Sequence, residues 1–205
     1  MYTERRGESP DKTRSIVLAG VGGQGTILAA NLLATALVGH GYDVKTSEVH
    51  GMAQRGGSVI SMVRFGAAVA SPLVPFGEAE ALVCTELLET LRNIEYLSED
   101  GVVIASGTRV DPLPVLQGSV EYPADAAERI VNLVPGSVIV NAADLAAQAG
   151  DARAANTVLL GILSPTLPVS VDEWLATIGR LVKAKAVDTN SEAFLTGRGI
   201  ALMED

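Results

Sequence analysis

The stretch Ser15-Ile16-Val17-Leu18-Ala19-Gly20-Val21-Gly22-Gly23-Gln24-Gly25-Thr26 decides the fold of this chain. It begins with an aliphatic run that predicts a short buried strand, and residues 26–38 form an apolar run that predicts a helix. The glycines between them fit the pattern G-x-G-x-x-G, with one additional glycine. In this context the glycines let the backbone turn sharply and leave amide groups open at the positive end of the helix. The candidate cofactor- or ligand-binding residues of this first loop are Gly20, Gly22, Gly23, Gln24, Gly25 and Thr26.

Two other interpretations of the first loop remain open. The glycines can simply allow the strand and the helix to pack closely. A dinucleotide site would need an acidic residue about 20 positions later, at the end of the second strand. Glu48 lies 23 residues past Gly25 and meets this requirement only imperfectly. An anion contact, a dinucleotide site and tight packing are therefore three alternatives.

Strands and helices alternate along the rest of the chain. Aliphatic runs predict strands at 42–49, 58–65, 81–85, 102–106 and 137–141, and an edge strand at 120–122. Helices are predicted at 86–97, 124–134, 142–149, 152–163 and 170–182, then a polar connector at 183–192 and a tail segment to Met203, docked by Phe194 and Leu195. The alternation predicts an α/β fold: a Rossmann-like, mostly parallel sheet with helices on both faces, in three α/β/α layers. We expect residues 1–14 to be a flexible tail and residues 15–205 to be a single domain with a C-terminal helical segment.

The second glycine-rich loop, residues 50–57, combines several chemically active side chains between two predicted strands. Its candidate ligand-binding residues are His50, Gln54, Arg55, Gly56 and Gly57. An arginine beside a glycine backbone can hold a phosphate, a carboxylate or an acidic residue of a partner. The alternative is structural: His50 and Gln54 can hydrogen-bond the loop to itself, and Arg55 can pair with Glu48. Both glycine-rich loops follow or precede strand ends, so we expect them to meet at one edge of the sheet.

The bulk properties exclude some function classes. The net charge of −9 argues against nucleic-acid binding, because a duplex is bound through a basic face. A mean hydropathy of +0.31 is high for an isolated soluble chain and favours a surface partly covered by partner subunits. The first residues lack the apolar centre of a signal peptide, and no apolar run approaches the roughly 20 residues of a membrane span. We expect a cytoplasmic protein that does not contact the membrane.

The sequence contains no recognisable reaction centre. It has one cysteine and two histidines, whereas an iron–sulfur cluster or a structural zinc site needs about four ligands. Cys84 lies in an aliphatic run and is expected to be a small buried side chain, and His40 is expected to cap the end of the first helix. We predict neither a catalytic residue nor a metal ligand, and no cofactor bound by this chain alone. Anion-binding features without a reaction centre are typical of an accessory subunit.

These residues resemble a known family. The segment Gly20–Gly25, followed by Glu48-Val49-His50-Gly51-Met52-Ala53-Gln54-Arg55-Gly56-Gly57, is similar to the beta subunits of indolepyruvate ferredoxin oxidoreductases. These correspond to the gamma-type domain of the wider pyruvate, ketoisovalerate and other 2-oxoacid:ferredoxin oxidoreductases. Residues 156–161 and the pattern Asn190, Ala193, Phe194 and Gly197 are also similar, so that the resemblance spans most of residues 15–200.

The resemblance implies an accessory subunit that is inactive alone. In such a complex, a 2-oxoacid such as indolepyruvate or another arylpyruvate is oxidatively decarboxylated to an acyl-coenzyme A, and ferredoxin accepts the electrons. Thiamine diphosphate and the iron–sulfur clusters are then expected on the larger alpha subunit, in a hetero-oligomer. Arg55 and the backbone of residues 22–26 are the expected contacts to coenzyme A or to the partner. The alternative is a free-standing dinucleotide-binding or regulatory module of Rossmann type, which would need Glu48 on a ribose.

Overall fold

The computed structural model describes residues 12–50 and 57–203, which form a single six-stranded sheet in the order β2-β3-β1-β4-β5-β6. Strands β1, β4, β5 and β6 run parallel, and β3 is antiparallel to both of its neighbours, β1 and β2. The predicted mostly parallel sheet is therefore confirmed, with one reversed strand. The strands are β1 (Arg14–Val21), β2 (Asp43–His50), β3 (Ser58–Gly66), β4 (Ala79–Cys84), β5 (Leu97–Ser106) and β6 (Val138–Val140).

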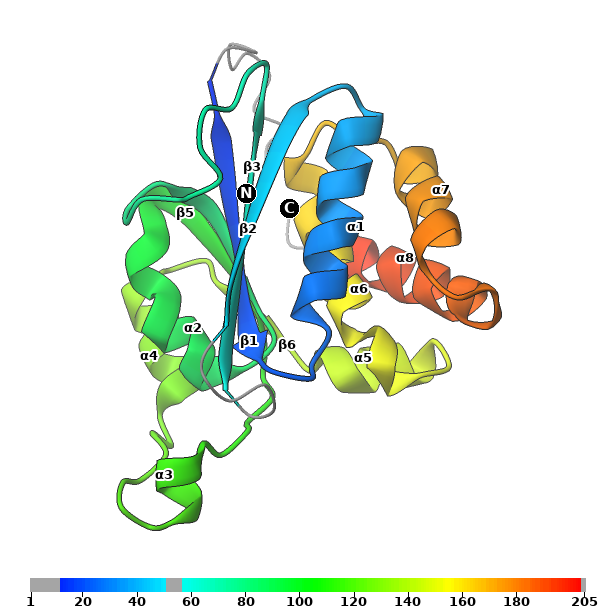
Figure 1. Cartoon of the computed structure of the whole chain (residues 1–205). Coiled ribbons are helices and arrows are strands. Elements are labelled where there is room, and N and C mark those ends of the chain that lie inside the picture. Colours follow the sequence, from blue (N-terminus) through cyan, green and yellow to red (C-terminus); the bar gives the residue numbers. More distant parts are fainter. Residues whose placement is uncertain (1–11, 51–56, 204–205) are drawn as a thin grey trace.

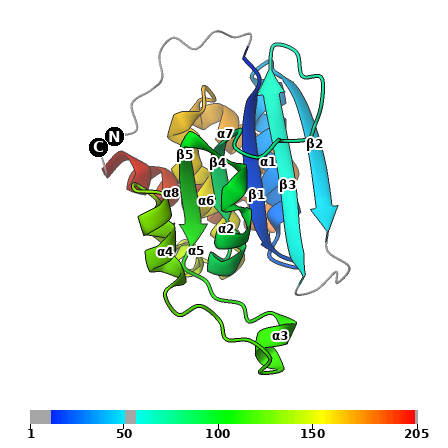
Figure 2. The same ribbon diagram turned by 90° about the vertical axis from the view of Figure 1, so that its left-hand side faces the viewer.

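Helices cover both faces of the sheet, which confirms the three-layer arrangement (Figure 1). One face carries α1 (Thr26–Gly39), α5 (Ala142–Gln148), α6 (Ala155–Leu163), α7 (Val171–Leu181) and α8 (Val187–Met203). The other face carries α2 (Leu87–Asn93) and α4 (Ala126–Leu133), and α3 (Leu113–Leu116) lies beyond the layers (Figures 1 and 2). Short 3-10 turns occupy Ile94–Tyr96, Ala152–Ala154, Ser164–Thr166 and Ala184–Ala186.

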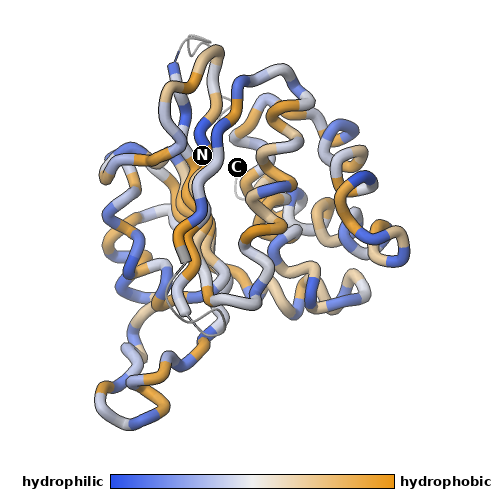
Figure 3. The backbone as a smooth tube through the Cα atoms, in the orientation of Figure 1, coloured by the Kyte–Doolittle hydropathy of each residue, from blue (hydrophilic) through white to orange (hydrophobic). Residues whose placement is uncertain are grey.

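The core lies on both sides of the sheet because the central strands are buried on both faces. In β1, Ile16 and Leu18 pack under α1, α6 and α8, whereas Val17 and Ala19 pack toward α2 and α4. This explains why β1 is a continuous aliphatic run and does not alternate between apolar and polar residues. The apolar colours of the tube in Figure 3 concentrate along the sheet and on the helix faces turned toward it. None of the helices in residues 12–50 and 57–203 combines the length and apolarity needed to cross a membrane.

Several local predictions are confirmed. His40 caps α1, and its backbone amide donates to the carbonyl oxygen of Ala36. Its Nδ1 atom also lies 3.0 Å from Oε1 of Glu173 in α7. Cys84 is fully buried. Phe194 is fully buried too, with its ring centroid 5.4 Å from that of Trp174, and so docks the C-terminal helix as expected.

Three predictions are wrong. Residues 120–122 form no strand, because the Tyr122 side chain is turned inward to bond Glu86. The polar connector at 183–192 is helical from Val187 onward, and the expected tail segment is the rest of the same helix. Its polar Asn190 is buried, where it accepts a hydrogen bond from Thr157 and donates one to a backbone carbonyl. Leu195, expected to dock the tail, is 41% exposed because it lies on the outer side of α8.

Candidate functional site

The two glycine-rich loops meet where β1 ends and β3 begins. Val21 is paired with Ser58 in the antiparallel register, and the amide of Gly22 donates to the carbonyl oxygen of Gly57 at 2.8 Å. The expected meeting of the loops is thereby confirmed at their described ends. This edge also holds the carboxyl ends of β4, β5 and β6, which are parallel to β1. Ligands of such sheets bind outside this edge, at the point where the strand order reverses.

The first turn of α1 is open to an anion. Its N-cap residue, Gly25, has a φ of 81°, which favours glycine, and the helix has neither a side-chain cap nor an acidic residue in its first turn. Thr26 is buried, and its Oγ1 atom has no hydrogen-bond partner among the described residues. The positive end of a helix with unbonded amide groups favours phosphate or carboxylate. A cavity of about 270 Å³ adjoins this turn and is lined by Val21, Gly22, Gly23, Gly25, Thr26, Ile27 and Val59.

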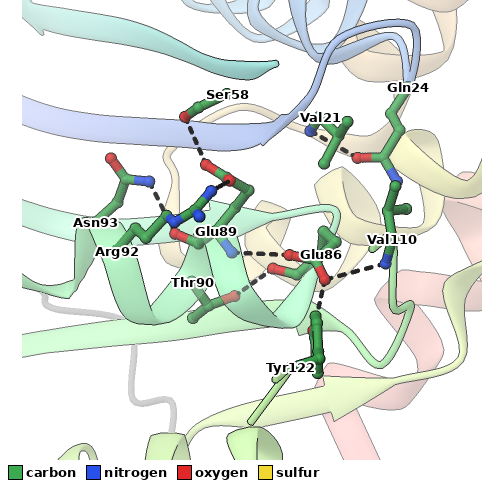
Figure 4. A network of polar contacts seen from close by, with 10 residues as sticks. All are labelled: Val21, Gln24, Ser58, Glu86, Glu89, Thr90, Arg92, Asn93, Val110 and Tyr122. Carbon is green, nitrogen blue, oxygen red and sulfur yellow. Dashed lines mark hydrogen bonds and ion pairs between the residues drawn. The ribbon is translucent and has the colours of Figure 1, made fainter. Parts of the chain in front are cut away.

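The Gln24 side chain fixes the loop instead of extending into solvent. Its Oε1 atom accepts hydrogen bonds from the Val21 amide at 2.8 Å and from Oγ1 of Thr85 at 2.6 Å (Figure 4 shows the bond to Val21). Asn156 in α6 donates to the Gln24 carbonyl oxygen at 2.6 Å. A Cβ atom on Gly20 would lie 1.9 Å from Oγ1 of Thr85, so only glycine leaves room for this arrangement. Gln24 and Gly20 thus shape the loop, and the backbone amide groups in the first turn of α1 remain for a ligand.

A second cleft, of about 390 Å³, opens beside the loop between the carboxyl ends of the strands and α6. Hydroxyl groups of Thr85, Ser106 and Thr108 line it, and Arg153 stands at its side. The guanidinium of Arg153 is bonded to Asp151, and this pairing, with the backbone amide of Arg153, holds the pKa of Asp151 at about 2. The cleft can accept polar ligands through hydroxyl groups, but the described part of the chain places no cluster of three or more metal-binding side chains there or elsewhere.

Two buried carboxylates, Glu86 and Glu89, lie at the start of α2 and were missed in the sequence (Figure 4). Oε2 of Glu86 accepts from the Glu89 amide at 2.8 Å, and its Oε1 accepts from Oη of Tyr122 at 2.6 Å and from the Val110 amide at 3.2 Å. Glu89 accepts from Ser58 at 2.5 Å and from Arg92 at 2.6 Å. Both groups are satisfied by these bonds, as buried charges must be. The one signal in the sequence was an acidic residue directly after a buried strand, repeated three positions later in the expected helix.

The structure places only part of the predicted site. Gly20, Gly22 to Thr26 and Gly57 lie together at the sheet edge, and His50 is the last residue of β2. Gln54, Arg55 and Gly56 lie outside the described residues, so their role as ligand contacts stays a prediction. The pairing of Arg55 with Glu48 stays untested for the same reason.

The position of Glu48 bears on the dinucleotide alternative. Glu48 is paired with Ser61 of β3, and Ser61 is paired with Leu18 of β1. One whole strand therefore separates Glu48 from β1, a distance of roughly 10 Å at ordinary strand spacing. In the dinucleotide fold the acidic residue ends the strand that neighbours β1 directly. The sheet order thus does not bring Glu48 to the place that a ribose contact requires.

The single thiol has no evident role at this edge. Cys84 is fully buried near the end of β4, and burial raises the pKa of its thiol to about 12. A reactive or metal-binding cysteine has a lowered pKa and access to solvent. One buried cysteine and two histidines in the whole sequence do not fit the donor set of an iron–sulfur cluster.

Comparisons with known proteins agree on one family. Residues 15–200 match the family described as pyruvate ferredoxin/flavodoxin oxidoreductase. Two curated relatives, from Thermococcus kodakarensis and Pyrococcus horikoshii, are called indolepyruvate oxidoreductase subunit IorB; each is 41% identical over 191 residues, which are 91% of this chain and 95% of the relative.

Solved structures share the fold. The gamma subunit of a keto/oxoacid ferredoxin oxidoreductase from Geobacter sulfurreducens has a TM-score of 0.68 at 24% identity, covering 93% of this chain and 99% of that one. A 2-oxoglutarate:ferredoxin oxidoreductase from Magnetococcus marinus has a TM-score of 0.69 at 19% identity and covers 94% of this chain but only 32% of that one. The resemblance inferred from the two glycine-rich loops is confirmed by the family match and the curated relatives: this chain belongs to the pyruvate ferredoxin/flavodoxin oxidoreductase family.

Proposed function

We propose that this chain is the small subunit of an oxidoreductase that acts on indolepyruvate or another arylpyruvate, in a hetero-oligomer with a larger subunit. Its curated relatives, 32–41% identical over most of the chain, are IorB subunits of indolepyruvate oxidoreductases. The family comprises subunits of oxidoreductases that use ferredoxin or flavodoxin. We infer that ferredoxin accepts the electrons of the complex.

The chemistry of the chain supports a division of labour between the subunits. The residues present do not fit an iron–sulfur cluster. In the described part of the chain, no cluster of acidic or histidine side chains offers ligands for the divalent cation that accompanies thiamine diphosphate. We therefore assign thiamine diphosphate and the iron–sulfur clusters to the larger subunit. The small subunit then supplies binding surface and orientation, and no redox step passes through its own residues.

The single observation that carries a binding role is the open first turn of α1 beside the second glycine-rich loop. Unbonded amide groups, the buried Oγ1 of Thr26 and an adjoining cavity occur together at the edge where ligands of parallel sheets bind. Arg55 is five residues from His50, the last residue of β2, and two from Gly57, which is bonded to Gly22. We propose that this edge contacts the phosphate groups of coenzyme A where they enter the complex.

Reconstitution tests the proposed function. The chain alone is expected to show no turnover of an arylpyruvate and no iron absorbance. The two-subunit complex is expected to reduce a viologen dye with arylpyruvate and coenzyme A, and to lose this activity when the small chain is omitted. Full activity of the larger subunit alone would contradict the assignment.

A matched pair of variants tests the coenzyme A contact. In the reconstituted complex, Arg55→Ala is expected to raise the KM for coenzyme A about 10-fold or more, because a charge-assisted hydrogen bond to phosphate is lost. The control is Arg180→Ala, which removes an exposed arginine from α7 on the far side of α1 and should leave this KM unchanged. Equal KM values for coenzyme A in the two variants would show that Arg55 does not contact coenzyme A.

A further inference from the structure

Residues 111–121, called here the arm, leave the sheet edge between β5 and α4 and carry the short helix α3. Figures 1 and 2 show α3 projecting beyond the three layers in two perpendicular views. None of the residues of the arm is buried. The arm therefore adds nothing to the core, and packing of the core does not account for its projection from the layers.

The arm exposes large aliphatic side chains. Leu113 is 64% exposed, Leu116 is 71% exposed and Val120 is 55% exposed. Single exposed apolar residues are common on protein surfaces, but three within eight positions of one projecting segment form a concentrated apolar surface. Burial of such side chains by a partner would release free energy that the isolated chain does not gain.

The arm is held at its base by a buried charge. Oε1 of Glu86 accepts hydrogen bonds from the Val110 amide, where the arm leaves, and from Oη of Tyr122, where it returns (Figure 4). The guanidinium of Arg109 lies 4.4 Å from the centre of the Tyr122 ring and is bonded to Asp111 at 2.6 Å. Glu86 is only 1% exposed, and burying a carboxylate costs free energy unless hydrogen bonds in the protein replace those that it made to water. The fold thus maintains a buried charge that orients a segment without a core of its own.

The arm is also stiff within itself. Pro112 and Pro114 restrict its backbone, and the Gln117 amide bonds the Leu113 carbonyl oxygen at 2.9 Å. Oγ of Ser119 donates to the Pro114 carbonyl oxygen at 2.9 Å and closes the turn at the tip. A preorganised segment loses little conformational entropy on binding, so its apolar area translates efficiently into affinity.

We propose that the arm is a docking element whose tip, Leu113 and Leu116, inserts into an apolar pocket of the larger subunit. This inference rests on the proposed function. In the Magnetococcus marinus structure the matched fold makes up 32% of one longer chain, so that there the fold is continuous with much additional polypeptide. In a two-subunit complex, the larger subunit would be the counterpart of that polypeptide. A second copy of this chain is the less suitable occupant, because two chains of net charge −9 repel each other.

The test measures binding of the purified full-length chain to the purified larger subunit by biolayer interferometry. The double variant Leu113→Ser/Leu116→Ser is expected to bind about 10- to 100-fold more weakly, since two central apolar anchors are lost. The matched control is Leu73→Ser/Leu202→Ser, which changes two leucines of similar exposure, 57% and 55%, outside the arm. It should bind within about 2-fold of the wild type.

Each alternative outcome overturns the docking role in a recognisable way. Wild-type binding by the arm variant overturns it while the proposed function stands. If the wild-type chain does not bind the larger subunit, the proposed function fails as well. If light scattering shows that the wild-type chain is a dimer and the arm variant a monomer, with unchanged binding to the larger subunit, the arm holds a second copy instead.

Discussion

Oε1 of Gln24 and Oγ1 of Thr85 lie 2.6 Å apart, although the two residues are 61 positions apart in the sequence. Gln24 belongs to the loop after β1, and Thr85 follows β4 directly. These are the two strands between which the strand order reverses. From β1 the chain continues to β2 and β3 on one side of the sheet, and from β4 it continues to β5 on the other side. The bond therefore joins the two chain segments that border the proposed ligand edge.

We predict that Gln24→Ala destabilises the fold by about 1–3 kcal/mol. The substitution leaves the Val21 amide and the Thr85 hydroxyl without their shared acceptor, and unsatisfied polar groups of this kind cost that much. Urea unfolding followed by circular dichroism measures the change. A double-mutant cycle with Thr85→Val should give a coupling free energy of about 1 kcal/mol. Strictly additive effects would mean that the two side chains do not interact in solution.

We predict that Gly197→Ala destabilises the protein by about 3 kcal/mol or more. A Cβ atom at this position in α8 would lie 2.0 Å from the Val158 carbonyl oxygen of α6, so the two helices would have to separate. Thermal unfolding by calorimetry measures the loss.

The same helix offers a control for this prediction. A Cβ atom on Gly199 would meet nothing within 4 Å, and Gly199→Ala should stabilise the protein by about 0.5–1 kcal/mol through the helix propensity of alanine. Similar effects of the two alanines would show that α6 and α8 do not cross as closely as the structure has them.

The order of the central elements could be predicted from the sequence because their signals are local. The aliphatic run at 15–19 predicts the centre of β1, which extends one residue before it and two residues after it, and the glycine-rich turn predicts the start of α1 at Thr26. The reversed direction of β3 was not predicted, although the connection from His50 to Ser58 is shorter than the roughly twelve residues that a crossover between adjacent parallel strands needs. The strand pattern is the same for a hairpin and for a crossover.

The remaining errors arise where polar side chains act inside the fold. Asn190 made the start of α8 look like a polar connector, and Glu86 looked like the first residue of an ordinary helix. Their partners, Thr157 and Tyr122, are 33 and 36 positions away, so that no local pattern reveals them. Buried polar pairs between distant residues escape sequence periodicity because each member resembles a surface residue.

We predict that Cys84 is inert in the folded protein. Its thiol is fully buried, and a pKa of about 12 leaves on the order of one thiolate in ten thousand at pH 8. An aromatic disulfide reagent should therefore give no colour with the native chain and one equivalent in guanidinium chloride, since the sequence contains one cysteine. Rapid labelling of the native protein would contradict the burial of β4.

We predict that Tyr122→Phe loosens the base of the arm. Burial, followed by the hydrogen bond to Glu86, raises the pKa of Tyr122 above its usual range. In an alkaline absorbance titration, one of the four tyrosines should ionise later than the others, and this step should be missing in the variant. Hydrogen exchange at the Val110 amide should become faster, because one of the two bonds that close the arm is gone. An unchanged exchange rate at the Val110 amide would show that the Tyr122 hydroxyl does not help to hold the base of the arm.

We predict that Glu173 stabilises the fold only above acidic pH. Its carboxylate accepts hydrogen bonds from the Ser170 hydroxyl and amide, each at 2.7 Å, and from His40, and these bonds lower its pKa to about 2. Because the folded pKa lies below the ordinary value of 4.5, the contribution is complete above pH 4.5 and is lost as the pH falls toward 2. In urea unfolding, the wild type should therefore be more stable than Glu173→Gln near neutral pH, and the two curves should converge as the pH is lowered through this window. A difference that stays constant down to the lowest pH would show that the reciprocal hydrogen bonds between Ser170 and Glu173 at the start of α7 act through shape alone, without the charge of Glu173.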